Sequence, residues 1–423
     1  MKISFIMPGR NNLKYARWSY DSIQKNKGYH QVEICFADDN SNDGTWEWCQ
    51  EMIVKDPNFK AIRNDSGQRV GHTILYDRLI KEVATSEVAI IWHCDMYLCP
   101  GALDEVEGYL YTAVHTDHVI GGFDYIPKYK TIVSLTRIEP PLHPDGPEKQ
   151  IANWGSEPEE FNEAAFLQWF LYPEADGFRP KRNEPTNGIF APWAFFVKDF
   201  KEIGGHDPLY RPQSKEDSDI FNRFKLNGVT FIQTWKGFVY HMTCKGSRFN
   251  PTLTIAGINS KEWEEHNIKS TRNFIRKWGT VVQHNEYLNP TISPKFNVEF
   301  RITNSTLRLI EILEPFCDSL RCDLDKDLLQ QYLYNESKKT DFDLGLKISG
   351  NILPDVTVYI DCSKFTEADY SYINNLGSIV FGSNIEDDHS YSIGTLNVFV
   401  HKKINRVNDL IHINDKNYKF KLR

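Results

Sequence analysis

The alternation of apolar and polar positions in the first third of the chain predicts strands and helices that follow one another in turn. Apolar runs at residues 2–8, 32–37, 59–63 and 88–92 are typical of strands, and a further strand is expected at residues 119–122. Residues 13–26, 45–54, 71–84 and 101–114 repeat apolar positions at helical spacing. This order predicts an α/β fold, in which a Rossmann-like, mostly parallel sheet is flanked by helices.

The pattern changes twice along the rest of the chain. Residues 127–185 mix proline, aromatic and charged residues without a clear period, which is typical of a binding loop or lid. A strand region at 187–197, a helix at 217–226, a strand at 230–233 and a helix at 271–278 follow. Residues 290–294 resemble a linker, and beyond them we expect helices at 307–314 and 326–334 and strands at 356–360 and 378–381. The sequence therefore predicts a first domain at residues 1–289 and a smaller α/β accessory domain at residues 290–423.

The composition is typical of a globular protein and argues against several other classes of protein. Hydrophobic residues make up 40% and charged residues 25% of the 423 residues, which is the balance of a globular protein. The formal net charge is −8, so composition predicts no general attraction to nucleic acid or to an anionic membrane. No apolar run is long enough for a membrane span. The eight cysteines include no Cys-x-x-Cys pair, so we expect reduced thiols and a cytoplasmic protein.

Four polar clusters stand at the ends of predicted strands or at the start of a predicted helix. They comprise residues 38–45, 93–95, 215–219 and 239–248. In open α/β sheets, ligands bind beyond the carboxyl ends of the strands, and the polar loops at residues 9–12, 38–44 and 93–95 fall there. Carboxylates at these ends can accept hydrogen bonds from a nucleoside or hold a hard divalent cation. Each cluster also has a purely structural explanation, as a turn, a helix cap or a solvated surface.

The order and the spacing of these clusters resemble the family 2 glycosyltransferases, which have the GT-A type of nucleotide-sugar-binding fold. Residues 36–45, Phe-Ala-Asp-Asp-Asn-Ser-Asn-Asp-Gly-Thr, match the family's DD-x-S-x-DGT signature. His93-Cys94-Asp95 stands where the family carries its DxD metal motif. Residues 203–207, followed by residues 216–219, resemble its GGFD…ED-x-D signature on the acceptor side. Because these signatures occur in the right order over about residues 1–250, the match is specific.

The resemblance implies which residues would bind a nucleotide-sugar donor. They are Pro8, Arg10, Asp38, Asp39, Arg69, His93, Lys245 and Arg248. Asp39, helped by Asp38, would contact the nucleobase and the ribose, and this analogy favours a UDP-sugar. Pro8 and Arg10 would border the nucleoside pocket. Lys245 or Arg248 would neutralise the leaving diphosphate.

The resemblance also implies a metal ion and a catalytic base. Asp95 and His241 would coordinate Mn²⁺ or Mg²⁺ beside the diphosphate. Asp217 would deprotonate the acceptor hydroxyl, with Glu216 beside it, in a single displacement that inverts the anomeric carbon. The chain departs from the family where His93 replaces the first acid of DxD. A neutral imidazole adds no negative charge, so we expect weaker or more pH-dependent metal binding.

The acceptor side of the chemistry stays open at this stage. The resemblance implies that Gly204 and Gly205 would let the backbone approach the sugar. It does not identify the acceptor, which can be a glycan, a lipid-linked sugar, a protein or a modified base. Residues 290–423 can bind that acceptor, mediate homo-oligomerisation or brace the first domain. Two other functions compete: an inactive nucleotide-sugar-binding module and a sugar nucleotidyltransferase. The second ranks lower because residues 9–12 are too short for the Gly-rich basic loop of those enzymes.

Overall fold

The computed structural model describes residues 1–423 with the exception of 116–122, 176, 244, 246–258, 351 and 414–423. The chain divides into two compact units. The first unit comprises Met1–Gln213, Asn227–Glu264 and His284–Pro290, and the second comprises Ser214–Leu226, Glu265–Gln283 and Thr291–Arg423. The sequence analysis expected one boundary between two domains, at residues 289 and 290, and this boundary stays a prediction.

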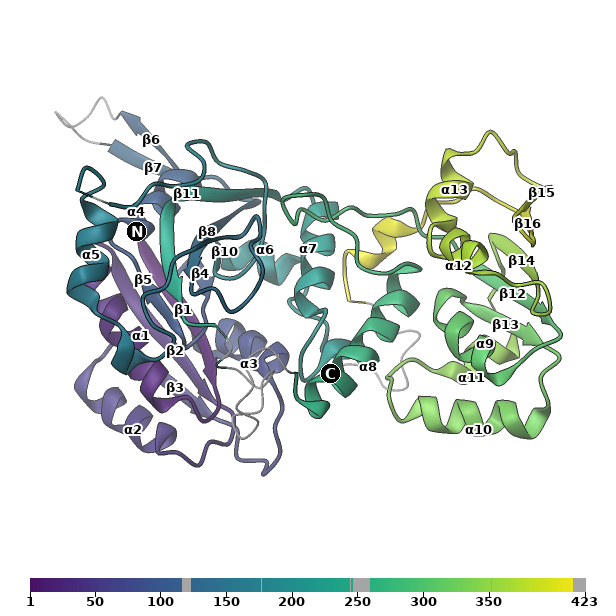
Figure 1. The fold of residues 1–423 in the computed structure, drawn as a ribbon, viewed down its shortest axis with the longest axis horizontal. Helices are drawn as coiled ribbons and strands as arrows, with labels where there is room; N and C mark the ends of the chain where they lie inside the picture. The colour runs from purple at the N-terminus through teal and green to yellow at the C-terminus, as the bar shows by residue number, and fades with distance from the viewer. Residues whose placement is uncertain (116–122, 176, 244, 246–258, 351, 414–423) are drawn as a thin grey trace. The chain divides into compact units, whose positions relative to one another are not determined.

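The first unit is built on a nine-stranded sheet (Figure 1). Its strands are β1 (Lys2–Gly9), β2 (Gln31–Asp38), β3 (Phe59–Arg63), β4 (Val88–Ile91), β5 (Met96–Leu98), β8 (Thr131–Glu139), β9 (Lys149–Ile151), β10 (Trp193–Phe196) and β11 (Thr230–His241). They lie in the order β3-β2-β1-β4-β10-β8-β11-β5, and β9 pairs with β8. Five of the neighbouring pairs are parallel, which confirms the mostly parallel sheet. Strand β10 is antiparallel to both β4 and β8, so β8 and β11 run in the same direction as β1, β2 and β4.

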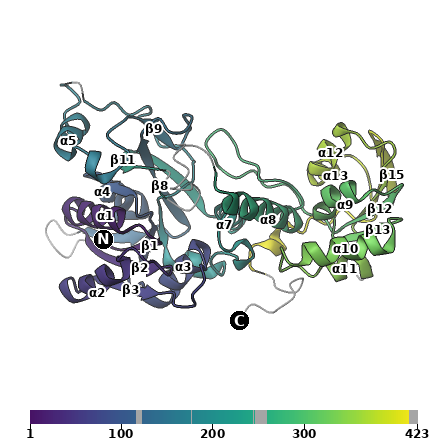
Figure 2. The same cartoon turned by 60° about the horizontal axis from the view of Figure 1, so that its bottom comes forward.

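Helices flank this sheet, and β1, β2 and β3 lie side by side among them (Figures 1 and 2). The helices are α1 (Leu13–Asn26), α2 (Thr45–Lys55), α3 (His72–Arg78), α4 (Ala102–Leu110), α5 (Glu163–Leu171) and α6 (Val197–Glu202), with a π-helical turn at Leu79–Val83 and 3₁₀ turns at Pro158–Glu160 and Pro208–Tyr210. Helices α1, α2 and α4 contact β5, β3 and β11 respectively. Buried apolar side chains of the strands and helices form one core, in which Phe5 and Trp92 meet edge to face at 5.0 Å between ring centroids.

Two expectations for the first unit are wrong. The helix expected at residues 101–114 ends at Leu110, and Tyr111–His115 forms β6, which pairs with β7 (Phe123–Pro127) as a hairpin. The segment 127–185 is not irregular throughout, because it contains β8, β9 and α5. Strand β8 is buried along almost its whole length, so its sequence lacks the alternation that marks a half-buried strand. The strand expected at 119–122 lies outside the described residues.

The second unit has its own five-stranded sheet, in the order β13-β12-β14-β16-β15. The strands are β12 (Val298–Thr303), β13 (Ser319–Cys322), β14 (Val356–Asp361), β15 (His389–Ile393) and β16 (Leu396–Val400). The helices are α7 (Glu216–Leu226), most of α8 (Lys261–Trp278), α9 (Leu307–Leu313), α10 (Lys326–Ser337), α11 (Leu344–Ser349), α12 (Glu367–Asn374) and α13 (Leu376–Gly382), with 3₁₀ turns at Glu314–Phe316 and Val407–Leu410. The strand expected at residues 378–381 is instead part of α13, since a short apolar run fits either structure.

Candidate active site

The polar loops of the first unit meet at one edge of its sheet. Strands β1, β2, β4, β8 and β11 run in the same direction, so the residues that follow or end them share that edge. His93 follows β4, Glu139 ends β8, and His241 ends β11. Asp95 precedes β5, which pairs antiparallel with β11 so that Met96 lies opposite His241. The sheet therefore places residues 93–95 beside side chains from two strands, β8 and β11, that are distant in the sequence.

His93, Asp95 and His241 form a compact group with the geometry of a metal site. One ligand atom from each lies within 4.8 Å of the others. Asp95 and His241 are buried, and the Nε2 atom of His241 is 3.4 Å from Oδ1 of Asp95. The backbone N–H of Met242 donates to the carbonyl of Asp95 at 3.0 Å, which fixes the two strand ends against each other. The structure thus brings the two predicted metal ligands, Asp95 and His241, together with His93, which the sequence analysis placed among the donor-binding residues.

The ionisation of these groups is set by burial and by each other. Burial lowers the pKa of His93 to about 3, so its imidazole is neutral and can donate a lone pair. Burial would also lower the pKa of His241, but Asp95 and Glu139 outweigh it and raise that pKa to about 9. Burial opposes ionisation of Asp95, yet the charge and hydrogen bond of His241 hold its pKa below the usual value. A cation bound here would replace the proton on His241.

The ligand set fits a divalent cation that accepts both hard oxygen and softer nitrogen ligands. Two imidazoles and one carboxylate supply both nitrogen and oxygen donors, and the remaining coordination positions would be left to a ligand or to water. Mg²⁺ prefers oxygen donors alone, whereas Mn²⁺ accepts imidazole as well. Of the two metals implied by the resemblance, Mn²⁺ therefore fits this group better.

Glu139 contacts His241, and the sequence analysis did not include it among the candidate residues. Its Oε1 atom lies 2.7 Å from Nδ1 of His241, and the side chain is 2% exposed. Arg137 and Lys149 pair with the same carboxylate at 3.1 and 3.0 Å. Although burial disfavours the charge, these cations and His241 hold the pKa of Glu139 well below its usual value. A carboxylate at this position fixes the ring of His241 so that Nε2 faces Asp95. The available signal was an acid at the end of an apolar run, inside a segment interpreted as irregular.

Asp38 and Asp39, at the end of β2, are both buried and both tie loops together. The backbone N–H of Ser41 donates to Asp38 at 3.2 Å, and Arg63 pairs with Asp38 at 3.2 Å. Asp39 accepts hydrogen bonds from the side chain of Asn64 at 2.6 Å and from the backbone N–H groups of Val70 and Gly71 at 3.1 and 2.9 Å. Asp39 thus fixes the loop at residues 64–71, which contains Arg69. Its contact with a nucleobase stays a prediction.

Hydrogen bonds also connect the loop that follows β1 with the loop that follows β2. The backbone N–H of Asn11 donates to the hydroxyl of Ser41 at 2.9 Å, and that of Leu13 donates to Asp43 at 3.0 Å. Asp43 also accepts from the backbone N–H of Thr45 at 3.1 Å, so one carboxylate binds the first backbone N–H of both α1 and α2. The DGT part of the motif is therefore explained by structure alone.

Other predicted donor-binding residues border the same edge. Pro8 is half-buried and Arg10 is exposed. Between them, a Cβ atom on Gly9 would lie 2.9 Å from the ring of Phe36, so only glycine fits there. Arg69 donates to the side chain of Gln213 at 2.7 Å and pairs with Glu262 at 3.1 Å.

Lys245 belongs to a cluster of charges on the first turn of α1. Its Nζ atom lies 2.7 Å from Glu157, which also pairs with Lys14 at 2.6 Å and accepts from Tyr15 at 2.5 Å. Burial would raise the pKa of Glu157, but the two lysines and Tyr15 lower it to about 2. Glu157 thus holds the side chain of Lys245 in place. Arg248, its predicted companion, lies outside the described residues.

The predicted acceptor-side residues are distributed between the two units. Glu216 and Asp217 open α7, which belongs to the second unit, and Glu216 is buried. In the same helix the buried Asp219 pairs with Arg223 and Lys277, each at 2.7 Å. That acid therefore anchors α7 to α8. The roles of Glu216 and Asp217 stay predictions.

Gly204 and Gly205 lie in the first unit and have a structural role of their own. Both adopt positive φ angles, of 90° and 83°. A Cβ atom on Gly205 would lie 2.3 Å from the carboxylate of Asp77, which accepts from the backbone N–H of His206 at 3.0 Å. The glycine pair therefore lets this turn dock against α3.

The chain was also compared with known proteins. Residues 4–204, just under half of the chain, match the model of the family described as glycosyl transferase family 2. The sequence has no match among curated proteins. None of the helices in the described part of the chain combines the length and the apolar character that a membrane span requires.

Three solved structures are similar to part of this chain. One is GalNAc-T7 with UDP, GalNAc and Mn²⁺, at 15% identity and a TM-score of 0.43 over 66% of this chain and 48% of that one. Another is the mannosyltransferase PcManGT from Pyrobaculum calidifontis with GDP-Man and Mn²⁺, at 15% identity and a TM-score of 0.37 over 57% of each chain. The third is S. aureus TarS 1–349 with UDP, at 12% identity and a TM-score of 0.38 over 65% of this chain and 72% of that one. This chain thus spans about half of the length of the first two.

Proposed function

We propose that the protein is a glycosyltransferase, which moves a sugar from a nucleoside-diphosphate sugar to a hydroxyl group of an acceptor. The observation that carries the proposal is the group formed by His93, Asp95 and His241 at the carboxyl edge of the sheet. The match of residues 4–204 to the model of glycosyl transferase family 2 supports the same reaction class. A metal-ligating group beside a nucleotide-binding edge is the arrangement that diphosphate chemistry needs.

On the donor side, the loop that follows β2 and the loop at residues 64–71 would hold the nucleoside. Asp38 and Asp39 fix the shape of these loops, and Pro8, Arg10 and Arg69 border them. Because both carboxylate oxygens of Asp39 already accept hydrogen bonds from the protein, we expect it to act mainly by positioning backbone groups for the base. A uridine nucleotide is favoured by the resemblance alone.

On the leaving-group side, His93, Asp95 and His241 would hold Mn²⁺ and Lys245 would stand nearby as a cation. Such an ion, when bound, neutralises charge on a departing diphosphate. Glu139 keeps the ring of His241 oriented, and Glu157 keeps Lys245 in place. The chain itself thereby supplies positioning and electrostatics, which are the main sources of catalysis in such transfers.

The transfer would proceed by a single displacement with inversion. The acceptor oxygen forms a bond to the anomeric carbon while the bond from that carbon to the diphosphate oxygen breaks. Asp217 takes the proton of the acceptor hydroxyl, with Glu216 beside it, and the nucleoside diphosphate leaves. The anomeric configuration of the product, measured by NMR coupling constants, tests the inversion, since retention of configuration would contradict it.

A donor panel tests the proposal before any acceptor is known. The purified protein is mixed with UDP-, GDP- and dTDP-sugars, with Mn²⁺ or with EDTA, and nucleotide release and thermal stability are measured. We expect one donor to stabilise the protein and to be hydrolysed slowly, only with metal. Stabilisation without any turnover would instead favour an inactive nucleotide-sugar-binding module, and turnover in EDTA would contradict the metal role of Asp95 and His241.

The base is tested in the same assay by Asp217→Asn. Loss of a general base typically lowers rates by about 100-fold to 10,000-fold, and we expect a loss in that range for donor hydrolysis. Donor binding, measured by thermal shift, should stay unchanged. Full activity of this variant would show that Asp217 is not the base.

A further inference from the structure

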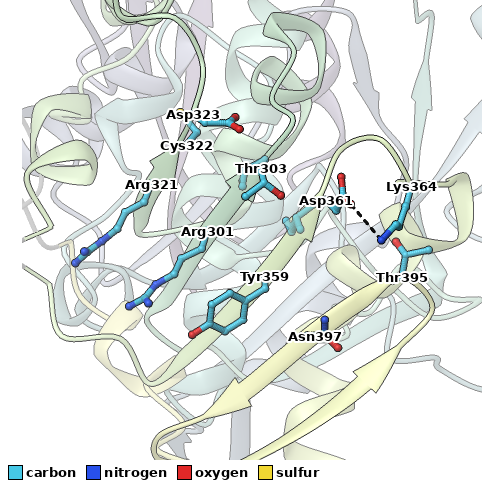
Figure 3. A pocket seen from close by; sticks show the side chains of 12 residues that line it. Arg301, Thr303, Arg321, Cys322, Asp323, Tyr359, Asp361, Lys364, Thr395 and Asn397 are labelled. Carbon is cyan, nitrogen blue, oxygen red and sulfur yellow. Dashed lines mark ion pairs between the residues drawn. The ribbon is translucent and has the colours of Figure 1, made fainter.

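A hollow of about 510 Å³ lies on the second unit, over the carboxyl ends of β12, β13 and β14 (Figure 3). Strand β12 lies between the other two, and the chain passes first to β13 on one side and then to β14 on the other. The carboxyl ends of parallel strands at such a switch point are a recurrent place for ligands in α/β sheets. None of the residues predicted from the sequence to bind the donor or the metal lines this hollow.

The floor of the hollow is a row of side chains that crosses four strands. Arg321, Arg301 and Tyr359 are register partners on β13, β12 and β14, and Asn397 lies opposite Tyr359 on β16. Alternating residues of these strands, such as Phe300 and Val358, are buried on the other face of the sheet. The row therefore forms an exposed polar face that backs onto an apolar core. The guanidinium carbon of Arg301 lies 5.5 Å from the centre of the Tyr359 ring.

A buried carboxylate holds the two arginines side by side. Glu299 is 2% exposed, and its two oxygens lie 2.8 Å from the Nε atoms of Arg301 and Arg321. Each guanidinium is thus held through Nε, and within the described residues its terminal nitrogens donate to no protein acceptor. Two arginines directly opposite each other destabilise a sheet, and one carboxylate neutralises only half of their charge. This arrangement leaves the terminal nitrogens of both guanidinium groups available to a ligand in the hollow.

The rim of the hollow at the strand ends is rich in acceptors and hydroxyl groups. Asp323 accepts from the backbone N–H groups of Asn304 and Ser305 at 2.8 and 2.9 Å, and so fixes the loop after β12. Asp361 accepts from the side chain of Asn304 at 2.8 Å and pairs with Lys364 at 3.3 Å (Figure 3). Thr303 and Thr395 lie along the same rim. Figure 3 places these groups at one end of the hollow and the arginines at the other.

We propose that this face binds an anionic saccharide and that this saccharide is the acceptor of the transfer. Paired guanidinium forks match a carboxylate, phosphate or sulfate group. The carboxylates, threonines and Asn397 match sugar hydroxyls, which both donate and accept hydrogen bonds. Tyr359 offers an aromatic ring beside them. The identification of the saccharide as the acceptor rests on the proposed glycosyltransferase function, whereas its binding to the second unit does not.

Three dextrans of matched length test the binding: neutral dextran, carboxymethyl-dextran and dextran sulfate, each fluorescently labelled and titrated with the full chain. Anisotropy measures the dissociation constant at fixed salt. We expect at least one anionic dextran to bind at least about tenfold more tightly than neutral dextran. The comparison of the two anionic polymers identifies whether a carboxylate or a sulfate suits the arginine pair.

Variants locate the binding on the hollow. Arg301→Lys combined with Arg321→Lys keeps the charge that Glu299 needs but removes both forks, and should weaken anionic binding by about tenfold or more. Tyr359→Leu, which leaves the Glu299 pairs intact, should weaken it as well. Lys402→Ala is the control, because it removes one exposed charge beyond the opposite end of β16. Binding should then change less than about twofold, and a melting curve verifies that each variant folds.

The possible results separate this proposal from the proposed function. Equal binding of all three dextrans, or equal loss in the lysine variants and in Lys402→Ala, overturns the anionic site. Metal-dependent donor hydrolysis without any binding of an anionic dextran overturns the site and leaves the transferase intact. Anionic binding that depends on the arginines, in a protein that hydrolyses no donor, supports the site but overturns its assignment to an acceptor.

Discussion

Both units place acidic side chains at the carboxyl ends of parallel strands, yet they use them differently. In the second unit Asp323 accepts hydrogen bonds from two backbone N–H groups of a neighbouring loop. Asp361 accepts from the side chain of Asn304 and pairs with Lys364. In the first unit Asp38, Asp39 and Asp43 do the same, whereas Asp95 meets two histidines. Most of these strand-end acids therefore have a structural role. An acid can take part in chemistry where another strand places a suitable side chain beside it.

The partner in the first unit comes from a strand that is distant in the sequence. His241 ends β11, and the antiparallel pairing of β11 with β5 places it beside Asp95. Glu139 then orients the ring from β8. In the second unit the hollow that contains the strand-end acids is also lined by arginine, tyrosine and asparagine, and the lining residues that the structure describes include no histidine. The same fold principle thus gives one edge suited to a cation and another suited to an anion.

The largest expected difference between the two edges concerns Asp95→Asn and Asp361→Asn. The first removes a negative ligand from the metal group, so we expect metal-dependent donor hydrolysis to fall by roughly 100-fold or more. The second loosens a loop in the other unit and should lower the melting temperature without a comparable loss of hydrolysis. Rates with saturating Mn²⁺ and melting curves measure both effects. Equal losses of activity would remove the distinction between the edges.

Glu139→Gln sharpens the distinction within the first unit. The variant keeps the shape of the side chain but removes the charge that orients and supports His241, so we expect Mn²⁺ to bind about 10-fold to 100-fold more weakly. A titration with Mn²⁺, followed by thermal shift, measures the change. Glu148→Gln is a matched control, because Glu148 pairs with Arg137 at 3.2 Å and does not contact His241. An unchanged Mn²⁺ affinity in Glu139→Gln would contradict the positioning role.

Asp39→Asn tests whether Asp39 stabilises the loop at residues 64–71 or contacts the donor directly. The amide cannot accept from Asn64, Val70 and Gly71 at once, so we expect the free energy of unfolding to fall by about 1–3 kcal/mol and donor affinity to fall with it. Urea unfolding and donor titration measure the two effects. Asp65→Asn, an exposed position in the same loop, should change neither. Lost donor affinity at unchanged stability would instead indicate direct contact with the nucleotide.

The smallest effect is expected for a buried acid away from both edges. Burial would raise the pKa of Glu33, but hydrogen bonds from Lys60, Ser4 and Thr85 lower it to about 2. The stabilisation from this carboxylate is therefore complete above about pH 4.5 and is lost as the pH falls towards 2. Glu33→Gln should lower stability at pH 7 and flatten its decline between these values. Urea unfolding at several pH values measures the slope, and an unchanged slope would contradict the assignment.

Much of the first unit could be read from its sequence, because its signals are local. Strands β1 to β4 and helices α1 and α2 follow from apolar periodicity, and the position of Asp95 follows from a strand that runs into an acid. The match of residues 4–204 to the family confirms the recognition made from the motifs. A cytoplasmic location, homo-oligomerisation through the second domain and the donor nucleotide stay predictions.

The sequence by itself determined which side chains stand at the ends of strands, since that depends only on hydrophobic pattern and turn residues. Tertiary structure alone decided which of them meet. Glu139 reaches His241, and Arg301 reaches Arg321, through strand pairings that join distant segments. Neighbouring cations then hold the pKa of Glu139 well below its usual value. Strand order and register depend on the packing of the whole sheet, and no local run of residues encodes them.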